Sequence, residues 1–200
     1  PGGPDGPPAT GSPPTPRPAL RPVLHRLRHL RQAALTGPVL HLGVLAVQGA
    51  VSEHLDALRR AAQTKGVDIE AVPVRTAADL SDVNGLILPG GESTTISRLL
   101  RSGGLQKPLL KRVGKDLALF GTCAGLILLS KSAVSQVEDK DIQLLGLLDT
   151  KVDRNAFGRQ RDSFESALDI KGMGEMPAVF IRAPVVTKVD KSTEILARNE

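Results

Sequence analysis

The stretch LALFGTCAGLILLSK, residues 117–131, passes from one short apolar run through a pair of glycines into another. The run at 117–120 predicts a buried strand, and the run at 124–131 predicts a helix that follows it directly. Between them, residues 121–125 have the form Gly-x-Cys-x-Gly. A strand, a tight turn and a helix in so short a stretch indicate a sheet that is covered by helices.

The same alternation continues upstream. Short apolar runs at 42–47, 67–72 and 85–88 predict strands, and the intervening patterns predict helices at 50–65, 93–101 and 105–113, the first ended by Gly66. Buried strands that alternate with helices predict an α/β fold with a mostly parallel sheet, flanked by helices and connected by right-handed crossovers. After Lys131 the pattern changes to strand-like pieces, at 144–152, 163–170, 178–183 and 193–197.

Composition limits the classes of function. With four Phe and no Trp or Tyr, the core must consist of Leu, Val, Ile and Ala. The net charge of +5 lies mostly in residues 1–41, which hold five Arg and one Asp; the rest has 21 basic and 20 acidic residues, so a nucleic-acid partner is disfavoured. A single cysteine fits a reducing compartment, and we expect a cytoplasmic protein. No apolar run approaches the roughly 18 residues that would span a membrane.

The first forty residues differ from the rest. Residues 1–40 are rich in Pro, Gly and Arg, and we expect a disordered leader followed by one domain over residues 41–200. Residues 20–35 approximate a basic amphipathic helix, although a segment without a role in the domain is the favoured interpretation.

Cys123 is the first candidate for chemistry. On a strand-to-helix turn it would be the thiol form of a nucleophile elbow, with small neighbours that permit the tight turn and a helix start that favours the thiolate. The amide N–H of Ala124 would then point at a developing oxyanion. The alternative is a small buried hydrophobic residue, which free cysteine often is. The strand–turn–helix context favours the nucleophile.

A second glycine turn follows the strand at 85–88. PGGESTT, residues 89–95, lies at the carboxyl end of that strand, where ligands bind in open α/β sheets. The N–H of Gly91 could complete an oxyanion hole with that of Ala124. The alternative is a plain turn in which Ser93 or Thr94 caps the next helix.

Arginines recur among the later strands, in RNAFGRQ at 154–160 and FIRAP at 180–184. A guanidinium pairs with a carboxylate through two parallel hydrogen bonds. By spacing alone, solvated surface arginines would be the better explanation for each.

Five blocks together resemble one family from about His41 onward. They are LAVQGAVSEH (45–54), GLILPGGESTT (85–95), FGTCAGLILLSK (120–131), LLGLLDTKVDRNAFGRQRDSFE (144–165) and VFIRAP (179–184). The chain is similar to the glutaminase subunit of pyridoxal 5′-phosphate synthase, a class I (triad) glutamine amidotransferase with a flavodoxin-like sheet. FGTCAG is shared across glutamine amidotransferases, whereas PGGEST, RNAFGRQ and FIRAP are specific to this subunit.

The resemblance implies a reaction and its residues. Cys123 would attack the side-chain amide of L-glutamine, releasing ammonia and leaving a thioester that water cleaves. The ammonia would pass to a separate (β/α)8-barrel synthase subunit that makes pyridoxal 5′-phosphate. No cofactor or metal is expected on this chain. The implied glutamine-binding residues are Gly91, Glu92, Ser93, Arg154, Ile181 and Arg182, and Gln48 matches a position on the partner-facing side.

One element of the family pattern is missing. The family takes its catalytic base and the orienting carboxylate from a C-terminal His-x-Glu segment, but no histidine follows Cys123; the four are His25, His29, His41 and His54. His54 matches a position that is not the base, and we expect it to pack or to face solvent. The simplest hypothesis is a chain truncated at its C-terminus. A non-catalytic partner subunit is the alternative, and a related cysteine enzyme such as a γ-glutamyl hydrolase would not explain RNAFGRQ and FIRAP.

Overall fold

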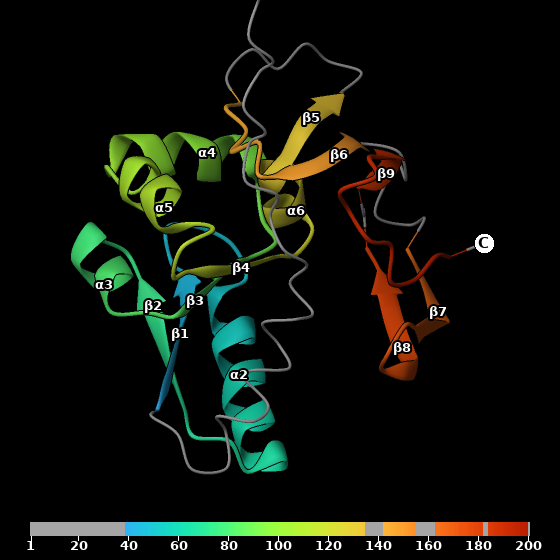
Figure 1. The fold of residues 1–200 in the computed structure, drawn as a ribbon, viewed down its shortest axis with the longest axis horizontal. Helices are drawn as coiled ribbons and strands as arrows, with labels where there is room; N and C mark the ends of the chain where they lie inside the picture. Colours follow the sequence, from blue (N-terminus) through green and yellow to red (C-terminus); the bar gives the residue numbers. More distant parts are fainter. Residues whose placement is uncertain (1–38, 135–141, 155–162, 182–183, 200) are drawn as a thin grey trace, which may run out of the picture.

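A computed structural model of the chain describes residues 39–134, 142–154, 163–181 and 184–199 (Figure 1). Its first part alternates strands and helices: β1 (Leu40–Leu45), α2 (Val51–Lys65), β2 (Ile69–Val74), α3 (Ala77–Ser81), β3 (Gly85–Leu88), α4 (Ser93–Ser102), α5 (Gln106–Arg112), β4 (Ala118–Gly121) and α6 (Ala124–Leu129). Strands alone follow: β5 (Ser130–Val134), β6 (Leu148–Asp153), β7 (Phe164–Ile170), β8 (Gly174–Phe180) and β9 (Val185–Val189). Strand β1 begins one residue before the predicted domain boundary.

The first four strands form one parallel sheet in the order β2-β1-β3-β4. The chain winds outward from β1 in both directions, so α2, which connects β1 to β2, covers the opposite face from α4 and α5, which connect β3 to β4. The predicted α/β class is therefore confirmed. In such a sheet the strand order reverses between β1 and β3, and ligands bind at the carboxyl ends of these strands.

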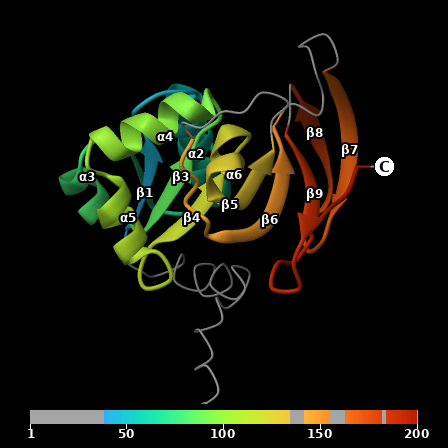
Figure 2. The same cartoon turned by 90° about the horizontal axis from the view of Figure 1, so that it is seen from above.

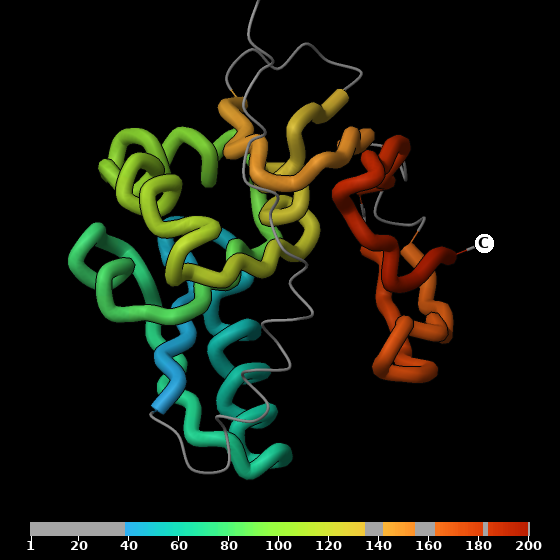
Figure 3. Tube along the Cα trace, in the orientation of Figure 1, coloured from blue at the N-terminus to red at the C-terminus, as the bar shows by residue number. Residues whose placement is uncertain are grey.

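Two further sheets extend the molecule away from β4. Strand β6 pairs in parallel with β5 and antiparallel with β9, and β7 and β8 form an antiparallel hairpin. In both cartoon views, β5 and β6 lie between the parallel sheet and this hairpin (Figures 1 and 2). The last described segment runs beside the hairpin (Figure 3), where the Lys171 amide donates to the Leu196 carbonyl at 2.8 Å.

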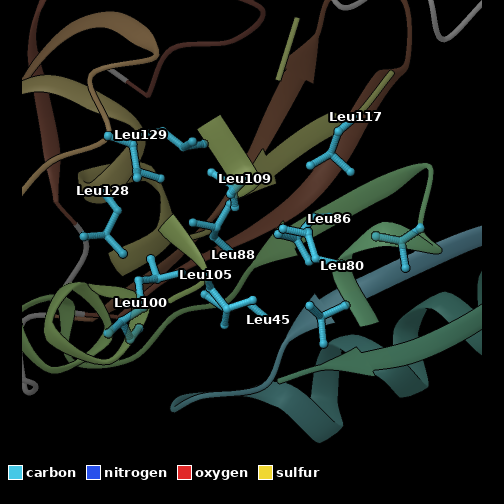
Figure 4. Close-up of a cluster of buried hydrophobic side chains, with 14 of the residues drawn as sticks. Leu45, Leu80, Leu86, Leu88, Leu100, Leu105, Leu109, Leu117, Leu128 and Leu129 are labelled. Atoms are coloured by element: carbon cyan, nitrogen blue, oxygen red, sulfur yellow. The ribbon is translucent and has the colours of Figure 1, made fainter. Parts of the chain in front are cut away.

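The core is aliphatic, as the composition predicts. Ten of its leucines are labelled in Figure 4, and they come from β1, β3 and helices α3 to α6, together with Leu105 and Leu117, which directly precede α5 and β4. Each fully buried leucine contributes about 1.5–3 kcal/mol. The three aromatic residues that the structure describes lie elsewhere: Phe120 is 61% exposed on β4, and the rings of Phe164 and Phe180 stack across the β7–β8 hairpin at 4.7 Å.

Local signals explain the helix ends. Gly66 adopts the left-handed conformation (φ 60°) that ends α2, and its N–H donates to the Ala62 carbonyl. Helix α3, which the sequence analysis did not predict, begins with a capping box in which Thr76 and Asp79 satisfy each other's backbone amides. Backbone hydrogen bonds, first that of Arg75 and then that of Thr76, hold the pKa of Asp79 below its ordinary value of 3.8.

One predicted helix is shorter than expected, and one predicted strand is absent. The helix predicted at 124–131 ends at Leu129, because Ser130 takes an extended conformation and begins β5. Its hydroxyl is satisfied there, donating to the Leu126 carbonyl and accepting from Thr150. Residues 193–197 form no strand. The β-branched residues at 185–189 form strand β9 instead, because they pair with β6. Among the described residues, no helix is both long and apolar enough to cross a membrane.

Candidate active site

Three loops meet at the carboxyl edge of the parallel sheet, following β1, β3 and β4. The loops after β1 and β3 are joined by two hydrogen bonds. The Ala50 amide donates to the Gly90 carbonyl at 2.9 Å, and the Glu92 amide donates to the side-chain oxygen Oε1 of Gln48 at 3.0 Å. This is the point at which the strand order reverses, so the candidate residues lie where the fold places a ligand.

Cys123 occupies a strained turn between β4 and α6. Its φ of 47° and ψ of −104° make it the one non-glycine residue with positive φ in the described part of the chain. Such a conformation costs about 1–3 kcal/mol and persists only where the surroundings enforce it. The residue is exposed, so its sulfur is open to a ligand. Strain and exposure together fit a nucleophile better than a buried hydrophobic residue.

Close backbone packing explains the glycines around Cys123. A Cβ atom on Gly125 would lie 2.0 Å from the Leu88 carbonyl oxygen, and one on Gly121 would lie 2.6 Å from the Gly125 carbonyl carbon. A Cβ added to Gly90 would lie 3.4 Å from the Cβ of Cys123, so the turn after β3 lies beside the cysteine. Close backbone packing therefore requires glycine at 121 and 125, whereas a Cβ at position 90 would make only an ordinary van der Waals contact.

The turn after β3 ends in the cap of α4. Glu92 takes the N-cap position, and its carboxylate accepts from the Thr94 amide at 3.2 Å. The alternative caps considered from the sequence, Ser93 and Thr94, lie inside the helix. Gly91 is exposed but is closely approached by the loop after β1, since a Cβ there would lie 2.6 Å from Gln48 Oε1 and 2.9 Å from the Cα of Gly49.

Arg154 reaches the same turn from the end of β6. Its Nη2 donates to the Ser93 hydroxyl at 2.9 Å and to the Thr94 hydroxyl at 3.3 Å, and lies 3.8 Å from a Glu92 carboxylate oxygen. The arginine side chain is only 10% exposed, whereas that of Glu92 is 61% exposed. A largely buried guanidinium at the rim of a ligand site can pair with a carboxylate of the ligand.

The arrangement has the parts of an acyl-transfer site. Ala124 is the first residue of α6, so its N–H has no partner inside the helix. An N–H without a partner at this position is what one half of an oxyanion hole requires, and the contribution of Gly91 to the other half stays a prediction. The structure thus brings together Gln48, Gly91, Glu92, Ser93, Cys123, Ala124 and Arg154.

One predicted residue, Ile181, makes no described contact with this cluster. Ile181 directly follows β8 and its side chain is 53% exposed. Arg182 lies outside the described residues, as do the remaining residues of the RNAFGRQ block after Arg154. Their roles in glutamine binding stay predictions.

Sequence reasoning missed one contact in the site. The ring of His54, in the first turn of α2, bonds through Nε2 to the Thr122 hydroxyl at 3.0 Å and through Nδ1 to the Ala50 carbonyl at 2.6 Å. The expectation of simple packing or solvent exposure was too general. The position of His54 in the sequence could have indicated this contact, because the first turn of a helix that follows a parallel strand lies at the carboxyl edge of the sheet.

Comparison with known proteins agrees with this geometry. Residues 44–200 match the SNO glutamine amidotransferase family. A "Pyridoxal 5'-phosphate synthase subunit PdxT" of Archaeoglobus fulgidus is 50% identical over 161 residues, 80% of this chain and 81% of that protein. One of Brevibacillus brevis is 44% identical over 162 residues, 80% of each. A solved structure described as a glutamine amidotransferase superposes with a TM-score of 0.69 at 45% identity, over 79% of both chains. With a cysteine elbow beside a glycine turn at the sheet edge, the chain belongs to the SNO glutamine amidotransferase family.

Proposed function

We propose that the chain hydrolyses L-glutamine to glutamate and ammonia, and that the ammonia serves pyridoxal 5′-phosphate synthesis. The family membership supports the reaction class, and the names of the relatives support the pathway. The observation that carries the proposal for this chain is the strained, exposed Cys123 beside the turn at Gly90. A barrel-shaped synthase subunit is the proposed partner, and a cytoplasmic location stays a prediction.

The proposed chemistry has two halves. The Cys123 sulfur attacks the side-chain carbonyl carbon of glutamine, and the N–H groups of Ala124 and Gly91 stabilise the oxyanion that forms. Collapse of this intermediate breaks the C–N bond and releases ammonia, leaving a thioester. Water then attacks the thioester, which yields glutamate and restores the thiol. Glu92, Ser93 and Arg154 would hold the amino acid end of the substrate, with Ile181 and Arg182.

Proton transfer from the thiol needs a base, and His54 does not fit that role. Both of its ring nitrogens are already bonded, one to the Ala50 carbonyl and the other to the Thr122 hydroxyl. His41, in β1, lies at the opposite edge of the sheet, where Nδ1 is 3.3 Å from a Glu70 carboxylate oxygen. Neither described histidine can therefore accept the Cys123 proton without rearrangement.

A covalent probe tests nucleophile and pocket together. A glutamine analogue with a diazoketone in place of the amide should alkylate Cys123, and L-glutamine should slow this reaction in a concentration-dependent way. Because the sequence contains one cysteine, the modified peptide is identified by mass spectrometry without ambiguity. An unmodified Cys123, or labelling that glutamine does not slow, would refute the glutamine site.

Turnover is measured as glutamate release from glutamine, with and without the synthase subunit. If the chain is catalytic, the wild-type protein should release glutamate and the Cys123→Ala variant should not. Equal rates for the two proteins would refute the nucleophile assignment. Efficient labelling by the analogue without any glutamate release would instead favour the non-catalytic partner subunit.

A further inference from the structure

His54 connects two of the three loops at the site through its ring. The residue lies on α2, and it bonds to Thr122, which is 68 residues away in the sequence and directly precedes the cysteine. The side chain is part-buried, so these bonds are partly shielded from water. A residue outside both glycine motifs thus contacts the turn that carries the nucleophile.

The hydrogen-bond partners determine which nitrogen of the neutral ring carries the hydrogen. The Ala50 carbonyl can only accept a hydrogen bond, so the nitrogen 2.6 Å from it, Nδ1, carries a hydrogen. In a neutral ring Nε2 is then an acceptor, and the Thr122 hydroxyl donates to it at 3.0 Å. One ring therefore bonds to its own helix on one side and to the nucleophile turn on the other.

The bonds form a closed circuit around the cysteine. The Gly90 carbonyl accepts from the Ala50 amide at 2.9 Å, and the Ala50 carbonyl accepts from His54. His54 in turn bonds to Thr122, and the Thr122 amide donates to the carbonyl of Leu88, two residues before Gly90, at 3.1 Å, which completes the circuit. The circuit fixes the glycine turn and the cysteine relative to each other.

Backbone bonds alone leave the Thr122 side chain unrestrained. The Thr122 amide donates to the Leu88 carbonyl at 3.1 Å, and the Gly125 amide donates to the Thr122 carbonyl at 2.8 Å. These bonds fix the two ends of the turn, whereas the strained φ of 47° lies between them at Cys123. A strained conformation persists only where the surroundings determine it fully, and the Thr122 hydroxyl provides a further restraint at this point.

We propose that His54 is a positioning residue for the glutaminase reaction, which holds Thr122 and thereby aims the Cys123 sulfur at the Gly90–Gly91 turn. The inference rests on the proposed function, because it assumes that Cys123 is the nucleophile. It requires the Nε2–hydroxyl bond in particular, and not merely a side chain of suitable size at position 54.

Two matched pairs of variants isolate that bond. In His54→Gln the side-chain amide reaches the place of Nε2 and can still bond to Thr122, whereas in His54→Asn it reaches only the place of Nδ1. Thr122→Ser keeps the hydroxyl, and Thr122→Val keeps the shape without it. The valine variant also serves where a change at position 54 would prevent folding, which the urea midpoint followed by circular dichroism would reveal.

The readout is the ratio of two labelling rates of Cys123. The diazoketone analogue of glutamine needs a correctly aimed sulfur, whereas iodoacetamide needs only an exposed one. We expect the analogue rate to fall about three- to tenfold in His54→Asn and in Thr122→Val, as the loss of one hydrogen bond predicts. In the same two variants the iodoacetamide rate should stay within about twofold of the wild-type rate. In His54→Gln and Thr122→Ser, both labelling rates should stay within about twofold of the wild-type rates.

The outcomes separate this inference from the proposed function. Ratios equal to that of the wild type in both His54→Asn and Thr122→Val would overturn the positioning role. An equal fall in His54→Gln and His54→Asn would also overturn it, since size and packing would then explain the effect. Failure of L-glutamine to protect the wild-type protein would instead refute the glutamine site itself.

Discussion

Replacing Gly125 by alanine should destabilise the protein and disturb the nucleophile turn. The new Cβ would lie 2.0 Å from the Leu88 carbonyl oxygen and 2.9 Å from the Leu88 Cβ. Carbon–oxygen contacts settle at about 3.3 Å, so α6 and β3 would have to separate by about 1.3 Å. Leu88 is fully buried, and its carbonyl accepts from the Thr122 amide, so the strand cannot move without loss of that bond.

Two opposing contributions determine the size of the effect. Overpacking costs about 1–3 kcal/mol, and a backbone contact this short places the cost near the upper value. Alanine regains about 1 kcal/mol of helix propensity over glycine, which leaves a net loss of about 2 kcal/mol in the free energy of unfolding. With a urea m-value of about 2 kcal/mol/M, the unfolding midpoint should fall by about 1 M.

Gly104→Ala is the matched control for this experiment. Gly104 has a φ of 70°, and a Cβ added there would meet nothing within 4 Å. The variant therefore loses only the left-handed preference, about 1 kcal/mol or 0.5 M in midpoint. Labelling of Cys123 by the glutamine analogue should fall in Gly125→Ala and stay unchanged in Gly104→Ala. A Gly125→Ala midpoint at or above that of Gly104→Ala would show that the close packing does not constrain the turn.

Two further variants each remove one charged side chain. The Asp79→Asn variant removes a carboxyl whose pKa is lowered in the folded wild-type protein, chiefly by the Arg75 amide. The stabilisation that this carboxylate contributes is full above pH 3.8 and is lost as the pH falls below that value. The midpoint difference from wild type should therefore be constant near neutral pH and shrink below pH 3.8; a difference that grows in acid would contradict this sign. In Arg154→Gln, loss of the proposed charged pairing between the guanidinium and the ligand carboxylate should raise the half-saturating concentration of the glutamine analogue about tenfold, with little change in its maximal rate. A reduced maximal rate at unchanged half-saturation would contradict a binding role.

The parallel half of the fold could be predicted because its signals are local. Strand β3 was predicted to the residue, since an apolar run stops at Pro89 and two glycines, and α2 ends where Gly66 predicts. Strand β1 begins two residues earlier than predicted and also ends two residues earlier, because the last apolar residues of its run, Ala46 and Val47, already belong to the turn. Apolar character alone does not separate a buried strand from the turn that follows it.

The later strands and the His54 contact depend on partners that are distant in the sequence. Strand β9 forms because Val185 and its neighbours pair with β6, more than thirty residues earlier, whereas the equally apolar residues near Leu196 only accept one backbone bond from Lys171. Likewise His54 gains its role from Thr122, a residue that the sheet order brings next to α2. No periodicity of the sequence carries this information.

The site owes its geometry to small residues more than to charged ones. Gly91, Gly121 and Gly125 let the backbone segments approach more closely than a Cβ atom would allow, and this packing holds Cys123 in a conformation that a non-glycine residue rarely adopts. Polar side chains then act at the rim, Arg154 from one side and His54 from the other. Substitutions at the glycines should therefore reduce stability and labelling together, whereas substitutions at the two rim residues should change labelling with a much smaller effect on the unfolding midpoint.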